Sequence, residues 1–116
     1  MNAHRLAASA VFLLGTLVAP VLTGAQKPDS ALAREFSQTV RPFVDEYCTE
    51  CHGGSEAEAQ FDLMSFTTLS SVLEDFSHWT LLMERLNNDE MPPISEPRPP
   101  ARLRQKVIDW VKAVRA

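Results

Sequence analysis

The residues of this chain that are best suited to chemistry lie together in the stretch Cys48-Thr49-Glu50-Cys51-His52. This stretch contains the only two cysteines and one of the three histidines. A Cys-x-x-Cys-His sequence is the attachment signature of a c-type haem. Each thiol would add to one vinyl group and form a thioether, and the adjacent imidazole would bind the iron. The motif therefore predicts one covalently attached haem c, with Cys48 and Cys51 as attachment points and His52 as an axial iron ligand.

Two other kinds of chemistry use the same residue types. Cys48 and Cys51 could act as nucleophile and resolving thiol of a thiol-disulfide oxidoreductase, because a neighbouring imidazole can lower a thiol pKa. The sequence lacks the alternating strands and helices expected around such a redox motif. A closed zinc site needs about four protein ligands, and only His78 and carboxylates remain outside the motif once the N-terminal segment is set aside. Haem attachment is therefore the favoured interpretation.

A second axial ligand is indicated by the Met-Pro-Pro sequence at residues 91–93. A methionine thioether often completes a low-spin c-type haem and raises its reduction potential. Two prolines restrict the backbone next to Met91, so a stiff loop could hold the sulphur on the iron. Met64 and Met83 lie at spacings typical of packing residues, and His78 lies near a predicted helix start. We therefore predict His52 and Met91 as the two iron ligands.

The N-terminal residues have the pattern of an export signal. A short region with one arginine precedes an apolar run over residues 6–22, and small residues then suit cleavage before Gln26. A glycine and a proline interrupt the apolar run, which favours a cleaved signal over a retained membrane anchor. The prediction is a signal peptide over 1–25 and a haem domain over 26–116. The domain is expected to be exported to the periplasm or another extracytoplasmic space.

The charge of the exported chain restricts its partners. Without the signal the chain has 10 basic and 15 acidic residues, a formal net charge of −5. This acidity argues against nucleic acid and anionic membrane surfaces as partners, and it favours a redox partner protein with a basic surface. Membrane association is expected only if the N-terminal segment is uncleaved. No phosphate-binding loop or paired-carboxylate site is present, so we expect an electron carrier rather than an enzyme.

Apolar spacing predicts that helices surround the motif. A first helical stretch capped by Asp29 or Ser30 carries an apolar face as far as Tyr47, with a break, restart or kink at Pro42. Further helices are expected over about 65–74, from a cap at residue 75 or 77 to about 86, and over about 100–114. The first and last helices should pack together, with Trp110 near Phe36, Phe43 or Tyr47.

The haem pocket should be formed by apolar residues of these segments. The expected lining residues are Phe61, Leu63, Phe66, Leu82, Leu86 and Ile94. Trp79 and Arg85 are candidate partners of the haem propionates, and the arginines of the last helix are expected to be solvated. Because so short a domain has little apolar surface to bury, we expect it to pack poorly without haem.

The run from Arg41 to Val114 resembles the Planctomycete-type cytochrome c domain, within the class I cytochrome c fold. The matching pieces are Arg41-Pro42-Phe43, the Cys-x-x-Cys-His motif, Phe61-Asp62-Leu63, Trp79, Glu90-Met91-Pro92-Pro93 and Ile108-Asp109-Trp110-Val111. The resemblance implies an all-α domain wrapped around one covalently attached haem, with His52 and Met91 as axial ligands. It also implies electron transfer outside the cytoplasm.

Two questions stay open at this point. Such domains often lie at the N-terminus of longer proteins, so the chain is expected to be either a free-standing carrier or the remnant of a longer protein. A gas-sensing haem module, in which Met91 leaves the iron to admit a ligand, is the remaining alternative within the haem interpretation.

Overall fold

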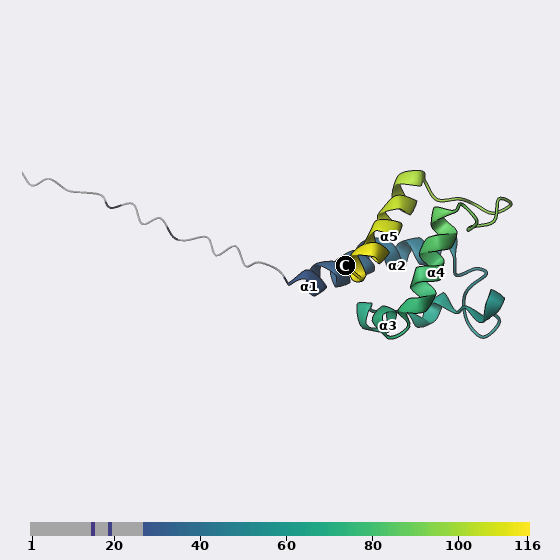
Figure 1. Ribbon diagram of the computed structural model, residues 1–116, viewed down its shortest axis with the longest axis horizontal. Helices are drawn as coiled ribbons and strands as arrows, with labels where there is room; N and C mark the ends of the chain where they lie inside the picture. The colour runs from purple at the N-terminus through teal and green to yellow at the C-terminus, as the bar shows by residue number, and fades with distance from the viewer. Residues whose placement is uncertain (1–14, 16–18, 20–26) are drawn as a thin grey trace, which may run out of the picture.

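The computed structural model describes residues 15, 19 and 27–116, and these are helical or irregular with no strand (Figure 1). The elements, in chain order, are α1 (Pro28–Glu35), η1 (Phe36–Val40), α2 (Arg41–Tyr47), η2 (Glu58–Gln60), η3 (Leu63–Ser65), α3 (Leu69–Glu74), α4 (Phe76–Asn87) and α5 (Ala101–Val114). The all-α prediction is confirmed for this part of the chain. The predicted signal peptide lies outside the described residues, apart from Gly15 and Ala19.

None of the described helices is both long enough and apolar enough to cross a membrane.

The first three elements follow one another without an interruption of helical backbone. Their middle turn, η1, is wound as a π-helix, and the Arg41 N–H donates to Phe36 O, five residues back. Pro42 lies in the first turn of α2, where its missing N–H is tolerated. The hydrogen-bond register therefore changes just before the proline. The restart predicted at Pro42 is confirmed, but the chain remains helical through it.

Two helix boundaries differ from those expected. The first helix begins at Pro28, with Lys27 rather than Asp29 or Ser30 at the N-cap. The helix expected over 65–74 is divided, because the backbone is extended at Phe66 and Thr68 and α3 begins only at Leu69. The Thr68 hydroxyl accepts a hydrogen bond from the Ser71 N–H, which makes Thr68 the cap of α3.

The core joins the first and last helices through aromatic rings. Phe36, Trp79 and Trp110 are almost completely buried. The Trp110 ring centroid lies 5.5 Å from that of Phe36 and 5.6 Å from that of Trp79. Trp110 Nε1 also donates a hydrogen bond of 3.0 Å to Leu32 O. The predicted packing of Trp110 against Phe36 is therefore confirmed.

The arrangement of the helices leaves the two predicted ligand segments at one end of the molecule. The chain leaves α2 into residues 48–62 and leaves α4 into residues 88–100, and both segments lie at the end opposite α1 (Figure 1). We call residues 88–100 the Met91 loop. The packed helices thus form a base from which both segments project.

The indole N–H of Trp110 provides a test of this core. Trp110→Phe keeps an aromatic ring but removes the hydrogen bond to Leu32 O and part of the buried volume. We expect the free energy of unfolding to fall by about 1–3 kcal/mol, measured by denaturant titration. Lys106→Ala on the exposed face of α5 is the control and should change it by less than about 0.5 kcal/mol. Equal effects of the two changes would contradict this account of the core.

Candidate functional site

The Cys-x-x-Cys-His motif forms a tight turn directly after α2. Cys48 O accepts hydrogen bonds from Cys51 N at 3.3 Å and from His52 N at 2.9 Å. Neither thiol is in a disulfide, and Cys48 is partly buried against the core while Cys51 is exposed. The structure therefore brings both thiols and the imidazole together on one turn, as the spacing predicts. We call residues 48–52 the motif turn.

The imidazole of His52 is held by a backbone carbonyl. His52 Nδ1 lies 3.0 Å from Glu58 O. A carbonyl oxygen only accepts, so Nδ1 carries the proton and Nε2 keeps its lone pair for a metal. Glu58 N donates to Cys51 O at 2.8 Å, so the same residue is bonded to the turn twice. This is the arrangement that orients a metal-binding histidine.

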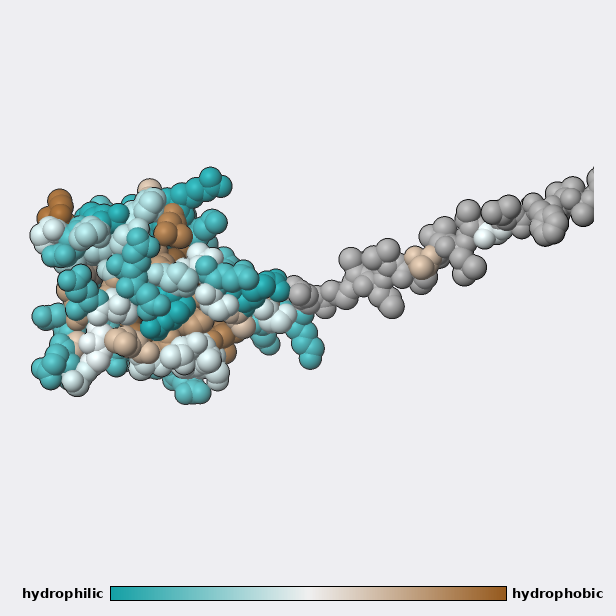
Figure 2. Space-filling model, turned by 180° about the vertical axis from the view of Figure 1, so that it is seen from behind, coloured by the Kyte–Doolittle hydropathy of each residue, from teal (hydrophilic) through white to brown (hydrophobic). Residues whose placement is uncertain are grey.

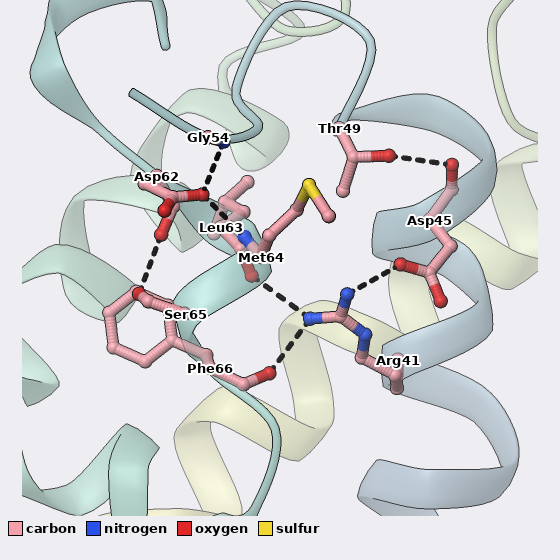
Figure 3. Close-up of polar contacts among 9 residues, drawn as sticks. All are labelled: Arg41, Asp45, Thr49, Gly54, Asp62, Leu63, Met64, Ser65 and Phe66. Atoms are coloured by element: carbon pink, nitrogen blue, oxygen red, sulfur yellow. Dashed lines mark hydrogen bonds and ion pairs between the residues drawn. The ribbon is translucent and has the colours of Figure 1, made fainter. Parts of the chain in front are cut away.

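The chain after the motif folds back and is bonded to it. Leu63 N donates to His52 O at 2.7 Å. The Asp62 carboxylate accepts from Gly54 N at 2.8 Å and from Met64 N at 2.9 Å (Figure 3). Asp62 thus joins the chain just after His52 to η3. These bonds close residues 52–64 into a compact loop.

Arg41 fastens this loop to α2. Its guanidinium donates to Leu63 O at 3.0 Å and to Phe66 O at 2.8 Å, and it pairs with the Asp45 carboxylate at 2.7 Å (Figure 3). Thr49 Oγ1 donates to Asp45 O at 3.0 Å, which holds the start of the motif turn on the same helix. No sequence pattern predicts this role of Arg41, because the two carbonyls that it binds lie more than 20 residues away.

The two glycines after His52 serve different purposes. A Cβ on Gly53 would lie 2.5 Å from Thr49 O and 2.9 Å from Met64 Sδ, so the chain passes too close for any side chain. Gly54 has φ of +80°, a backbone conformation that other residues rarely adopt, and open space around it. The sharp turn predicted here therefore favours glycine for two reasons. At Gly53 the neighbouring atoms leave no space for a Cβ, and at Gly54 the backbone has a positive φ.

The Met91 loop presents the second predicted ligand. Glu90 N and Met91 N donate to Arg85 O at 2.9 and 3.4 Å, which ties the loop to the last turn of α4. Pro92 is buried, and the peptide bond between Met91 and Pro92 is cis. The Met91 side chain is 38 % exposed. Met91 therefore lies at the same end of the molecule as His52 but outside the motif turn, and their pairing on one iron stays a prediction.

Three arginines near this loop pair with its acidic residues. The Arg85 guanidinium pairs with the Glu90 carboxylate, which raises the pKa of Arg85. Arg98 and Arg104 both pair with the Asp89 carboxylate. Arg85 was expected to meet a haem propionate, whereas the structure directs it to Glu90. Arg104 was expected to be solvated, whereas it is half-buried and pairs across 15 residues of sequence.

The predicted pocket residues divide into three groups. Leu63, Phe66, Leu82 and Leu86 are buried in the core. Phe61 is half-buried, with its ring 5.8 Å from that of His52. Ile94 is 91 % exposed. Figure 2 shows that hydrophobic atoms are scattered among hydrophilic ones on the face drawn there.

The indole N–H of Trp79 is buried without a hydrogen-bond acceptor among the described residues. Its ring is buried against Phe66 and Trp110, and its Nε1 has no hydrogen-bond partner within the described residues. A buried N–H without an acceptor is costly and unusual. An acceptor that is not part of this chain, such as the carboxylate of a haem propionate, would satisfy it. The orphaned N–H therefore fits the predicted cofactor.

The competing ligand candidates have other partners. His78 Nδ1 lies 2.5 Å from the Asp75 carboxylate, and its ring stacks on Phe61 with centroids 5.0 Å apart. Met64 packs over Gly53, and Met83 is partly buried against the core. Met83 has the packing role expected of it and His78 bonds to the N-cap residue of α4, whereas Met64 is 53 % exposed although it was expected to pack.

The structure also bears on the two other chemistries considered for the cysteines. Burial raises the pKa of the Cys48 thiol to about 12, so the thiolate needed of a nucleophile is scarce at neutral pH. Within residues 27–116 and the two isolated residues, no three His, Cys, Asp or Glu side chains gather as a metal site. The described residues therefore give no support to dithiol or zinc chemistry. A thioether is neutral, so it suits the partly buried sulphur of Cys48.

Residues 48–95 match the family described as Planctomycete cytochrome C. The match begins at the first cysteine of the motif turn and includes Met91 and both prolines after it. The helical fold of the described residues is compatible with a cytochrome c domain, and the family match indicates a haem-binding cytochrome. The match confirms that this segment resembles the Planctomycete-type cytochrome c domain, as its sequence predicts. No curated protein and no solved structure matches the chain.

Gly53 offers a test of how tightly the motif turn is built. Gly53→Ala would force a Cβ against Thr49 O, and we expect it to lower the free energy of unfolding by about 1–3 kcal/mol. Gly54→Asn is the matched control, because asparagine tolerates positive φ and the space there is open. Denaturant titration of both haem-loaded variants gives the measurement. A larger loss for Gly54→Asn than for Gly53→Ala would contradict the close-approach argument.

Proposed function

We propose that this domain is a one-electron carrier with a single covalent haem c. The observation that carries the proposal is the hydrogen bond from His52 Nδ1 to Glu58 O, on a turn that also presents two unpaired thiols. It leaves Nε2 of His52 as the free ligand atom beside both attachment points. No other residue pattern in the chain supports a different cofactor as directly.

Each residue then has one role. Cys48 and Cys51 would hold the haem through thioethers, His52 Nε2 and Met91 Sδ would bind the iron, and Trp79 Nε1 would donate to a propionate. When bound, the haem would supply an iron that cycles between the ferric and ferrous states. With two protein ligands on the iron, the site would have no position for a substrate. The proposed activity is electron transfer without catalysis.

Attachment is tested by making the full chain in a host that attaches c-type haem. We expect the intact mass to increase by one haem and the pyridine haemochrome to be of the c type. An unmodified mass, with thiols that cycle to a disulfide, would overturn the proposal in favour of dithiol chemistry. If the product begins at Gln26 and is recovered from the periplasm, the proposed export and cleavage are supported.

The second ligand is tested by replacing Met91. Met91→Leu should keep the covalent haem but abolish the far-red band of a methionine–ferric iron bond, and the reduced form should bind carbon monoxide rapidly. Met64→Leu is the matched control, because Met64 is also an exposed methionine, on η3, and is not a proposed ligand. It should leave the band and the slow binding unchanged. Rapid carbon monoxide binding by the unaltered protein would instead favour the gas-sensing alternative.

We also propose that the redox partner has a basic surface. Residues 42–84, which include the motif turn, contain nine acidic residues and no lysine or arginine. The acidic residues near the motif are exposed: Asp45, Glu46, Glu50, Glu56 and Glu58. Negative charge beside the proposed haem edge would attract a basic partner and accelerate their encounter at low salt.

Small charged redox reagents can test this without knowing the partner. At low ionic strength, electron exchange should slow with added salt for the cation hexaammineruthenium and accelerate for the anion ferricyanide. The double variant Glu50→Gln/Glu56→Gln should slow exchange with the cation about fourfold or more, since a unit charge about 10 Å away is worth about twofold in water. The control Glu35→Gln/Asp109→Asn removes two charges from α1 and α5. An equal effect of both pairs would show that only net charge matters.

A further inference from the structure

The second residue of the Met91 loop has an unusual backbone conformation. Asp89 has φ of +61°, which is uncommon for residues other than glycine. It lies two residues beyond the end of α4 and two residues before Met91. Strained positions of this kind persist only where surrounding contacts hold them. The direction in which the chain leaves α4 toward Met91 therefore depends on what holds Asp89.

Two arginines hold it from the far end of the loop. Asp89 Oδ1 accepts from the guanidinium groups of both Arg98 and Arg104, and Asp89 O accepts from Arg98 at 3.1 Å. Arg98 lies near the end of the Met91 loop and Arg104 lies on the first turns of α5. The contacts thus close the loop on itself and fasten it to the last helix. We call Asp89, Arg98 and Arg104 the Asp89 clamp.

We propose that the Asp89 clamp is the positioning device that keeps Met91 on the iron. The inference rests on the His52 and Met91 ligation proposed above. Asp89 touches neither cofactor nor ligand in this role; it fixes the loop that carries the thioether. Without the clamp, Met91 would leave the iron more often and external ligands could bind there, while the thioethers at Cys48 and Cys51 would still hold the haem.

The burial of the arginines makes this more than a surface ion pair. Isolated exposed pairs contribute little to stability, and the Asp89 side chain is 60 % exposed. However, Arg98 and Arg104 are each only 26 % exposed. The Asp89 carboxylate accepts from both arginines, and the Asp89 carbonyl accepts from Arg98 as well. A network of charge-assisted hydrogen bonds from partly buried donors contributes more to stability than a single exposed ion pair does.

The test uses the haem-loaded full chain and the variants Asp89→Asn, Arg98→Gln and Arg104→Gln. Asparagine tolerates positive φ, so Asp89→Asn removes the charge without adding backbone strain. We expect each variant to bind carbon monoxide about tenfold faster in the reduced form and to lose part of the ferric methionine band. Tenfold corresponds to about 1.4 kcal/mol in the methionine-off equilibrium. Added salt should likewise make the unaltered protein bind carbon monoxide faster and weaken its ferric methionine band, because salt screens the ion pairs.

Arg102→Gln is the matched control, because Arg102 lies on the same turn of α5 but is exposed and has no hydrogen bond within the described residues. It should leave carbon monoxide binding unchanged. Arg98→Lys should restore part of the methionine band, which a purely steric role of Arg98 would not predict. The double variant Asp89→Asn/Arg98→Gln should show less than the product of the two single effects, because both act through one contact.

The outcomes separate the clamp from the proposed function. If the unaltered protein has a methionine-ligated haem and Asp89→Asn does not change ligand binding, the clamp proposal is wrong and the electron carrier stands. If the haem is attached but Met91 is not its ligand, the clamp proposal also fails. If no haem is attached, both proposals are overturned.

Discussion

The hydrogen bond from His52 Nδ1 to Glu58 O is the constraint on which the rest of the site depends. A histidine side chain next to the two cysteines could rotate and change tautomer unless something fixes both its orientation and its protonated nitrogen. Glu58 can do so only because the chain folds back within six residues. That reversal requires the close backbone approach at Gly53 and the bonds that Asp62 makes beyond it. The orientation of one imidazole therefore explains much of the local sequence.

Aromatic packing connects this turn to the helical core. The ring of Phe61 lies 5.8 Å from His52 and 6.4 Å from Phe66, and Phe66 meets Trp79 edge to face at 5.6 Å. Trp79 in turn contacts Trp110 on α5. Because so few residues are buried in a chain of this size, each such contact carries a large share of the stability. The motif turn is thus held from the core side as well as by its own backbone.

Local and periodic features were predictable from the sequence, and long-range side-chain contacts were not. The motif, the methionine followed by two prolines and the amphipathic spacing of α5 are visible in short windows. By contrast, Glu58 acts through its backbone carbonyl, which any residue type could supply. Arg41 and Arg104 bond to groups 15 or more residues away, and a charged side chain in a helix gives no sign of its partner. The extended backbone at Phe66, whose carbonyl accepts from Arg41, was equally invisible in a short window of sequence.

The two proposed iron ligands are held by different kinds of interaction. His52 is held by hydrogen bonds with backbone groups of Cys48, Glu58 and Leu63, which salt hardly affects. Met91 is carried by a loop with ion pairs at Asp89 and Glu90, which salt and single charge changes weaken. The proposed attachment through Cys48 and Cys51 would be independent of both. The Met91 side could therefore be adjusted without loss of the proposed haem, so the methionine is where we expect ligation and reduction potential to be set.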